Sequence, residues 1–176
     1  MHGLIHAELE KFVETNYGQE AWRAILEEAG LEDRAYVPLG AYPDEESLAI
    51  VRAAAKLTET PAEAILEDFG EFIAPDLMAT YKSLIRPEWK TLDFLLNTEE
   101  TIHRVVRRQN QGAEPPHLKF EEAGPGTLRL LYDSPRRMSA VARGIIKGVA
   151  KHYGESVSLE ESKKADGSSE ITVRVT

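Results

Sequence analysis

The stretch LDFLLNTEETIHRVVRR, residues 92–108, decides the fold, because it predicts one long helix. Its apolar side chains recur at helical spacing and form a stripe, which is made of Leu92, Leu95, Leu96, Ile102 and Val106. His103 lies on the same stripe, seven residues after Leu96. A histidine in such a position is more often a hydrogen-bonded core residue than a metal ligand, so both interpretations stay open at this point.

Two antiparallel hairpins follow this helix. In the first, apolar and polar residues alternate over residues 118–132 around the turn Gly124-Pro125-Gly126. In the second, they alternate over residues 157–175 around Asp166-Gly167. Between the hairpins, the sequence predicts a helix over about 135–152.

The first half of the sequence predicts only helices. Apolar residues at helical spacing mark segments over about 5–13, 21–29, 44–57, 60–73 and 77–84. The clearest start signal is Thr60-Pro61-Ala62-Glu63, with a hydroxyl cap, a proline at the first helical position and a glutamate three residues after the cap. Helices followed by a small antiparallel sheet with two helices indicate an α+β fold. We expect a single domain over residues 1–176, divided near Arg86-Pro87 into a helical half (1–88) and an α+β half (89–176).

The composition excludes several classes of function. The chain has 21 basic and 30 acidic residues and a net charge of −9, which disfavours nucleic acid and anionic membranes as partners. No apolar run approaches the roughly 18 residues that span a bilayer, so we expect a cytoplasmic protein. The chain has no cysteine, so a metal must be held by histidine, carboxylate or methionine. The candidate histidines are His2, His6, His103, His117 and His152.

A second group of polar residues lies at the end of the first hairpin, in Tyr132-Asp133-Ser134-Pro135-Arg136. Tyr132 and Ser134 project to one face of an extended chain. We expect Pro135 to begin the next helix, with Ser134 as its cap and Arg136 in its first turn, where the backbone N–H groups favour an anion. Two hydroxyls and a guanidinium there would bind carboxylates, whereas the alternative is a capped helix with a surface arginine.

Taken together, these motifs resemble the H-NOX family of haem nitric oxide and oxygen binding domains. The resemblance rests on His103 in a long helix, Gly112-Ala113-Glu114-Pro115-Pro116, Tyr132-x-Ser134-x-Arg136 and the opening Met1-x-Gly3-x-Ile5. It also covers the segments Ala41-Tyr42-Pro43-Asp44 and Phe69-Gly70-Glu71, and so nearly the whole chain. One neutral imidazole is also what a haem iron needs from a protein on its proximal side.

The resemblance implies a haem b cofactor between a distal helical half and a proximal α+β half. His103 would be the axial ligand, and Tyr132, Ser134 and Arg136 would hold the two propionates. Pro116 matches the proline that presses on the porphyrin. Apolar positions that match haem contacts are Ile5, Leu77 and Ile145.

The resemblance also implies selectivity for nitric oxide. Oxygen-binding relatives place a tyrosine five residues after the arginine, and this chain has Val141 there. The supporting polar residue of those relatives matches Ile73. We therefore expect NO and CO binding at ferrous iron without a stable oxygen complex, unless the hydroxyl of Tyr81 or Ser139 replaces the missing donor.

We expect NO to weaken the bond between iron and His103, so that the helix over residues 92–108 is released and the two halves rotate. Relatives that stand alone commonly regulate a separate histidine kinase or diguanylate cyclase, so we expect such a partner. Arg104, Arg107 and Arg108 could contact it, although a run of this kind is more often a solvated face.

Two other classes of function compete with a gas sensor. The adjacent pairs Glu99-Glu100 and Glu121-Glu122 suggest solubilising charge rather than catalysis, because adjacent side chains point apart, so we expect no enzyme. A haem enzyme with peroxidase-like activity would need a distal acid–base residue, whereas the distal positions that the resemblance aligns are aliphatic; peroxide turnover dependent on His6 or His117 would favour it. The other alternative is a haem-free interaction module of the same fold. We expect His2, His6, His117 and His152 to be surface residues.

Overall fold

The computed structural model describes residues 3–38, 40–109 and 114–176. Its first half contains the helices α1 (Gly3–Tyr17), α2 (Gln19–Ala29), α3 (Asp44–Thr58) and α4 (Ala62–Thr80), and the short 3₁₀ helix η1 (Lys82–Leu84). Its second half contains a helical run of α5 (Thr91–Thr98), η2 (Glu99–His103) and α6 (Arg104–Gln109), then the strands β1 (His117–Gly124) and β2 (Thr127–Asp133), the helix α7 (Ser139–His152), and the strands β3 (Val157–Lys163) and β4 (Ser169–Val175). The expected α+β fold is confirmed. In the described part of the chain, no helix is long and apolar enough to cross a membrane.

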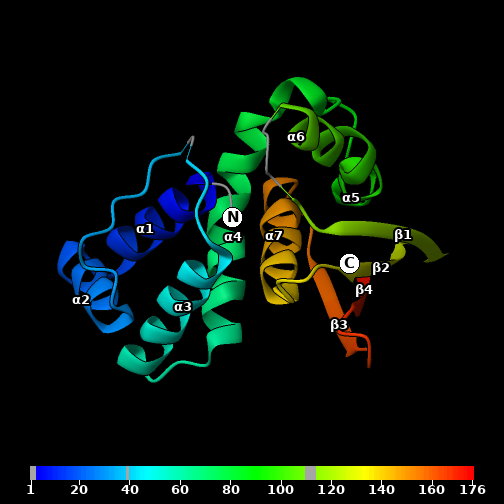
Figure 1. Cartoon of the computed structure of the whole chain (residues 1–176). Helices are drawn as coiled ribbons and strands as arrows, with labels where there is room; N and C mark the ends of the chain where they lie inside the picture. Colours follow the sequence, from blue (N-terminus) through cyan, green and yellow to red (C-terminus); the bar gives the residue numbers. More distant parts are fainter. Residues whose placement is uncertain (1–2, 39, 110–113) are drawn as a thin grey trace.

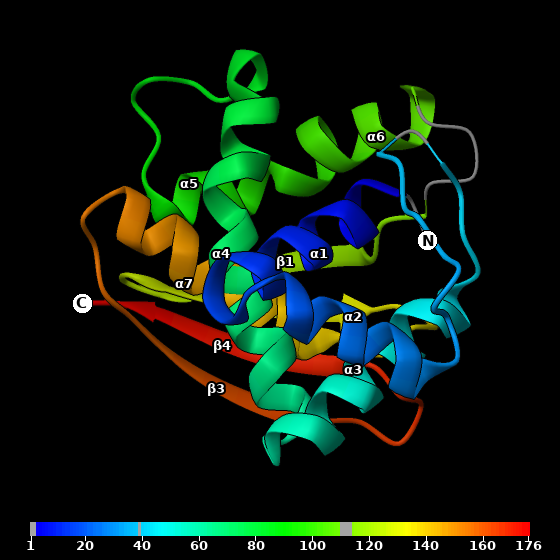
Figure 2. The same cartoon turned by 90° about the vertical axis from the view of Figure 1, so that its left-hand side faces the viewer.

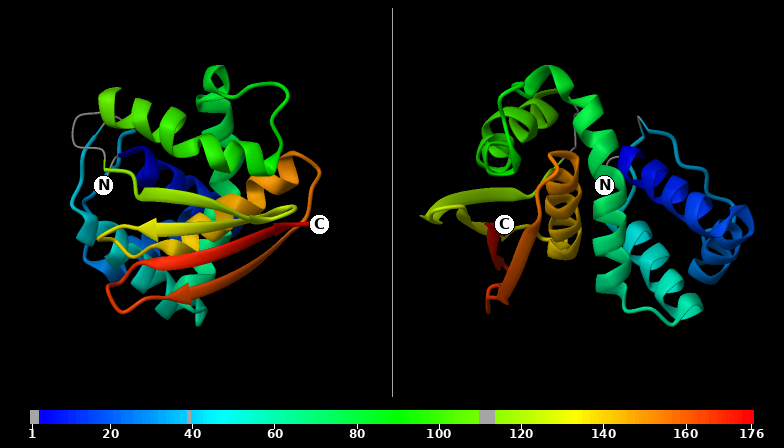
Figure 3. Two further views of the ribbon diagram at one scale, coloured as in Figure 1. Left: turned by 90° about the vertical axis from the view of Figure 1, so that its right-hand side faces the viewer. Right: turned by 180° about the vertical axis from the view of Figure 1, so that it is seen from behind.

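The strands form one antiparallel sheet in the order β1-β2-β4-β3, as the two predicted hairpins require. Leu128 pairs with Val173 and Leu130 with Ile171 across the central strands β2 and β4. These four side chains are almost fully buried, because they lie on the sheet face that packs against α7. Figure 3 shows α7 along one face of the sheet.

The helix α4 runs through the middle of the molecule, between α1–α3 on one side and α7 on the other (Figures 1 and 2). The expected break near residue 74 is wrong, because α4 continues through Pro75 to Thr80 and only η1 follows it. The predicted cap is also wrong, since Pro61 precedes the first helical residue and the Thr60 hydroxyl donates to the Thr58 carbonyl at 3.3 Å.

The contact between α4 and α7 includes close approaches of backbone atoms. A Cβ atom added to Gly144 would overlap the carbonyl oxygen of Glu67 and would lie 2.8 Å from the Cα of Gly70. A Cβ atom on Gly70 would overlap the carbonyl oxygen of Val141. Glycine at these two positions therefore permits the helix from the second half to pack directly on the helix from the first half.

Two apolar clusters form the core. The first is built mainly by α1–α4, with Phe69 and Ile73 each 1% exposed. The second lies between the sheet, α7 and α5, around Leu130 and Val149. Ile145 packs against both clusters, so α7 connects the two cores.

Candidate functional site

The helical run that carries His103 is continuous but irregular. It extends over residues 91–109, close to the expected 92–108, but Glu99–His103 form a π turn between α5 and α6. Before this turn, within α5, Leu96, expected on the apolar stripe, is 36% exposed, whereas Phe94 is 5% exposed. π turns inside α-helices occur frequently at functional sites.

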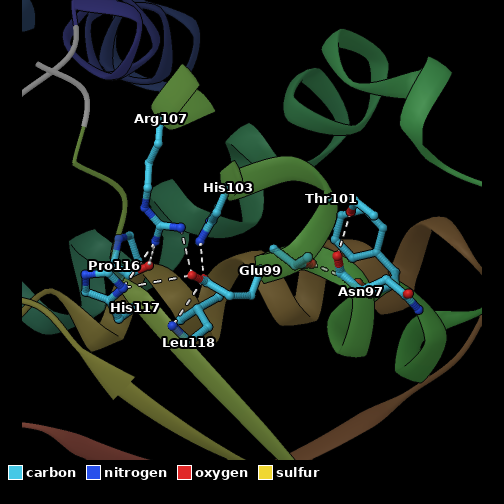
Figure 4. Close-up of polar contacts among 10 residues, drawn as sticks. Asn97, Glu99, Thr101, His103, Arg107, Pro116, His117 and Leu118 are labelled. Atoms are coloured by element: carbon cyan, nitrogen blue, oxygen red, sulfur yellow. Dashed lines mark hydrogen bonds and ion pairs between the residues drawn. The ribbon is translucent and has the colours of Figure 1, made fainter. Parts of the chain in front are cut away.

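The His103 ring is partly buried, with 15% of its side chain exposed, and one of its nitrogens contacts a carboxylate. Nδ1 lies 3.0 Å from Oε2 of Glu99 (Figure 4). Because a carboxylate only accepts, Nδ1 carries the proton and Nε2 carries the lone pair in the neutral ring. Burial lowers the pKa of His103, although the hydrogen bond to Glu99 opposes this shift. The ring is therefore neutral near pH 7, the form that binds a metal.

Glu99 is held by several groups at once. Its Oε1 accepts a hydrogen bond from Nη1 of Arg107 at 2.8 Å, and its Oε2 accepts one from the backbone N–H of Leu118 at 3.3 Å. Burial favours a higher pKa for Glu99, but Arg107 and His103 lower it overall, so the side chain stays a carboxylate. The expectation that Glu99 is solubilising charge is wrong. Its neighbour Glu100, 78% exposed, fits that description, and so do the exposed Glu121 and Glu122.

The three arginines near His103 have different surroundings. Arg107 donates to Glu99 and also to the Pro116 carbonyl at 3.3 Å, so it belongs to the site and not to a solvated face. Arg104 pairs with Glu100 at 3.6 Å near the surface, and Arg108 is exposed. The i,i+4 spacing from Glu99 to His103 is the sequence signal that could have identified the carboxylate as part of the site.

Tyr132, Ser134 and Arg136 lie together, as the sequence predicts, but not at a helix start. The helix α7 begins at Ser139, and the Arg137 N–H donates to the Ser134 carbonyl at 3.1 Å in a turn before it. The Ser134 hydroxyl accepts the Arg136 N–H at 3.3 Å and also hydrogen bonds with Tyr132. Burial raises the pKa of Tyr132, which keeps its hydroxyl protonated as a donor.

The Arg136 guanidinium connects the two halves of the chain. Its Nε lies 2.8 Å from Oδ2 of Asp44, at the start of α3, and its Nη1 donates to the Glu114 carbonyl at 2.5 Å. Partial burial favours a higher pKa for Asp44, but its cationic partners, Arg136 among them, lower it. Gly112 and Ala113, which precede Glu114 in the predicted loop, lie outside the described residues.

The apolar residues of the expected site lie inside the protein. Ile5, Leu77 and Val141 pack against the first core cluster, and Ile145 lies between the clusters. Pro116 is partly buried, and its carbonyl is within hydrogen-bond range of the His103 ring. Their roles toward a cofactor stay predictions.

The remaining histidines divide into two kinds. His117 and His152 are exposed, as expected. His6 is not a surface residue, because it is 0% exposed, its Nε2 lies 2.8 Å from the Ser47 hydroxyl, and its ring stacks on Tyr36 at 4.4 Å. Met1 and His2 lie outside the described residues.

The residues present fit a haem group. A neutral imidazole with its Nδ1 engaged suits an axial ligand, and two hydroxyls with a guanidinium suit carboxylates. Across residues 3–38, 40–109 and 114–176, no three or more His, Asp or Glu side chains gather to hold a metal ion.

Comparisons with known proteins identify the family of the chain. The model of the family described as "Haem-NO-binding" matches residues 2–161. Two curated relatives are soluble guanylate cyclases of Caenorhabditis elegans: gcy-32 is 27% identical over 158 residues, 86% of this chain and 23% of the relative. The other, gcy-35, is 25% identical over 170 residues, 93% of this chain and 25% of the relative. The chain thus spans about a quarter of the length of these relatives.

Solved structures show the same fold. An H-NOX protein from S. oneidensis in the Fe(II)NO state is 22% identical with a TM-score of 0.91, covering 100% of this chain and 99% of that one. The Fe(II) unliganded H-NOX protein from K. algicida is 24% identical with a TM-score of 0.91, covering 100% and 97%. Because the matched family binds haem and senses gas, the expectation that this domain is not an enzyme is confirmed. The chain belongs to the haem-NO-binding family, the H-NOX domains.

Proposed function

We propose that this chain binds haem b through Nε2 of His103 and serves as a sensor of nitric oxide, which also takes up CO and discriminates against dioxygen. One observation carries the proposal: His103 is a partly buried neutral imidazole whose Nδ1 is already engaged by Glu99, in a member of the haem-NO-binding family. When bound, haem supplies a ferrous iron with an open position for a diatomic gas.

The chain's own residues would hold the group from three sides. Tyr132, Ser134 and Arg136 would donate to the propionates, since they lie together at the end of β2 and in the turn that follows it. Pro116 lies beside His103 and would press on the porphyrin. The apolar faces would come from Ile5, Leu77 and Ile145.

Selectivity for NO over dioxygen would follow from side chains that lack a hydrogen-bond donor. Val141 on α7 and Ile73 on α4 are aliphatic and pack in the first core cluster. Dioxygen binding depends on a hydrogen-bond donor much more than NO binding does. Two hydroxyls could still substitute: Ser139 is buried at the start of α7, and Tyr81 packs against the second cluster.

Signalling would use the helical run over residues 91–109. His103 connects this run to the haem, and its release would free the run to move against the rest of the protein. We propose that the halves 1–88 and 89–176 then rotate along the contact between α4 and α7, where Gly70 and Gly144 bring the backbones together. A separate histidine kinase or diguanylate cyclase would receive the signal, and a cytoplasmic location stays part of the proposal.

Visible spectroscopy tests this function. We expect a Soret band in the purified or reconstituted chain, a shift on adding NO or CO to the ferrous form, and no lasting change when that form meets air. His103→Gly should lose the axial ligand and regain it from free imidazole, whereas His152→Gly, at an exposed position, should match wild type.

Each alternative has its own outcome in the same experiment. A missing Soret band after reconstitution would favour the haem-free interaction module. An oxygenated spectrum that persists in air would refute selectivity for NO. Peroxide turnover that depends on His6 or His117 would favour a haem enzyme.

A further inference from the structure

The carboxylate of Glu99 faces the nitrogen of His103 that would not bind the iron. Oε2 of Glu99 lies 3.0 Å from Nδ1 of His103, and both side chains are mostly buried, with 20% and 15% exposed. Metal-binding histidines commonly donate their second N–H to a carboxylate or a carbonyl, and that partner fixes the ring and makes it more basic. The contact is therefore of the kind that tunes a ligand.

The carboxylate of Glu99 is held in position by two further hydrogen bonds. Arg107, eight residues further along the same run, binds Oε1, and the N–H of Leu118 binds Oε2 from the start of β1. One oxygen thus meets the arginine, while the other meets the imidazole and the strand. Figure 4 shows these contacts converging on the carboxylate.

We propose that Glu99 is a positioning residue that tunes the axial ligand: it holds the Nδ1 proton of His103, directs the Nε2 lone pair to the iron and strengthens that bond. This inference rests on the proposed haem binding through His103. Glu99 thereby determines how firmly the helical run is held, and so how easily NO releases it.

The direction of the effect follows from charge. A carboxylate that accepts the Nδ1 proton raises the electron density at Nε2, which stabilises ferric iron relative to ferrous iron. Arg107 withdraws part of this density through Oε1, so the effect is smaller than for an unpaired carboxylate. Removing the charge of Glu99 should therefore shift the equilibrium toward the ferrous form.

The chain offers a matched control for this experiment. Glu100 is the next residue on the same π turn, carries the same charge and pairs with Arg104 at 3.6 Å, but 78% of its side chain is exposed. Glu99→Gln and Glu100→Gln change the net charge equally and keep the shape of the side chain. Only the first removes a carboxylate from Nδ1 of His103.

The experiment compares wild type, E99Q and E100Q as full-length ferrous and ferric haem proteins. In E99Q we expect the ferric–ferrous equilibrium to move about tenfold toward ferrous, about 59 mV for one electron, and the iron–histidine stretching frequency to fall in resonance Raman spectra. E100Q should match wild type in both measurements. Glu99→Asp, with a shorter carboxylate, should give values between those of wild type and E99Q.

Different failures point to different errors. If E99Q binds haem through His103 with the potential and stretching frequency of wild type, the Pro116 carbonyl is the effective acceptor and the inference is overturned. Equal shifts in E99Q and E100Q would mean that net charge alone is responsible, which also overturns it. If wild type takes up no haem, or keeps its axial ligand in His103→Gly, the proposed function itself is wrong.

Discussion

The contact between α4 and α7 gives the most quantitative prediction, for the substitution Gly144→Ala. The new Cβ would overlap the Glu67 carbonyl oxygen and would lie 2.7 Å from the Glu71 nitrogen. Both neighbours are backbone atoms of α4, so neither can rotate away. Overpacking of this kind costs about 3 kcal/mol, the upper part of the usual range.

A second effect has the opposite sign and makes the prediction sharper. Alanine inside a helix is favoured over glycine by about 1 kcal/mol, so G144A would be more stable than wild type if α4 and α7 could separate freely. The balance is a net loss of about 2 kcal/mol. With a urea slope of about 2 kcal/mol/M, the unfolding midpoint should fall by about 1 M.

Urea unfolding followed by circular dichroism measures this change, with all variants in the same state of haem loading. Gly30→Ala is the control, since Gly30 has φ 69° and no described atom within 4 Å of an added Cβ. It should lose only about 1 kcal/mol from the left-handed backbone. A G144A protein at least as stable as wild type would refute the close packing of the two helices.

Two further predictions concern buried polar groups. Arg143 on α7 binds Glu67 at 2.8 Å and also pairs with Glu161, so Arg143→Met should cost about 3 kcal/mol in urea unfolding, because it leaves the partly buried Glu161 without this cation and leaves Glu67 with Lys147 alone. Burial favours a higher pKa for Glu67, but Lys147 and Arg143 lower it below its usual 4.5. The unfolded chain therefore binds more protons, so wild-type stability should fall as pH drops below about 4.5, and a curve equally steep in R143M would contradict this assignment. Ser47→Ala removes the 2.8 Å contact with buried His6 and should lower the free energy of unfolding by about 1–3 kcal/mol, whereas Thr60→Ala, in the loop between α3 and α4, should change it little. Equal thermal shifts in S47A and T60A would show that the buried contact contributes nothing.

The fold was largely predictable because its strongest signals are local. Alternation on each side of Gly124-Pro125-Gly126 and of Asp166-Gly167 places all the strands of the sheet. The errors come from tertiary packing that overrides local rules. Pro75 remains inside α4, next to the fully buried Ala74, where the sequence alone predicts a break. Pro135 does not begin α7, because the turn before the helix extends to Met138.

Most residues of the candidate site could be predicted from the sequence, but the hydrogen bonds among them could not. The resemblance identified His103 and Tyr132-x-Ser134-x-Arg136, and the structure brings the latter three together. Glu99 was missed because a pair of adjacent glutamates is typical of solvent-exposed charge. The four-residue spacing from Glu99 to His103 places both side chains on one face of a helix, and it is the signal that distinguishes Glu99 from Glu100.

The π turn also allows this helix to change its length locally. A π turn holds about one more residue than an α turn, and each residue of an α-helix advances the chain by about 100°. Deleting one residue from 100–102 would therefore restore regular α geometry and leave α6 at nearly its present angle to α5, with Phe94 and Leu95 still in the core. A single codon lost there would keep both Glu99 and His103 but reduce their separation from four residues to three, so the carboxylate and the imidazole would meet in a different geometry.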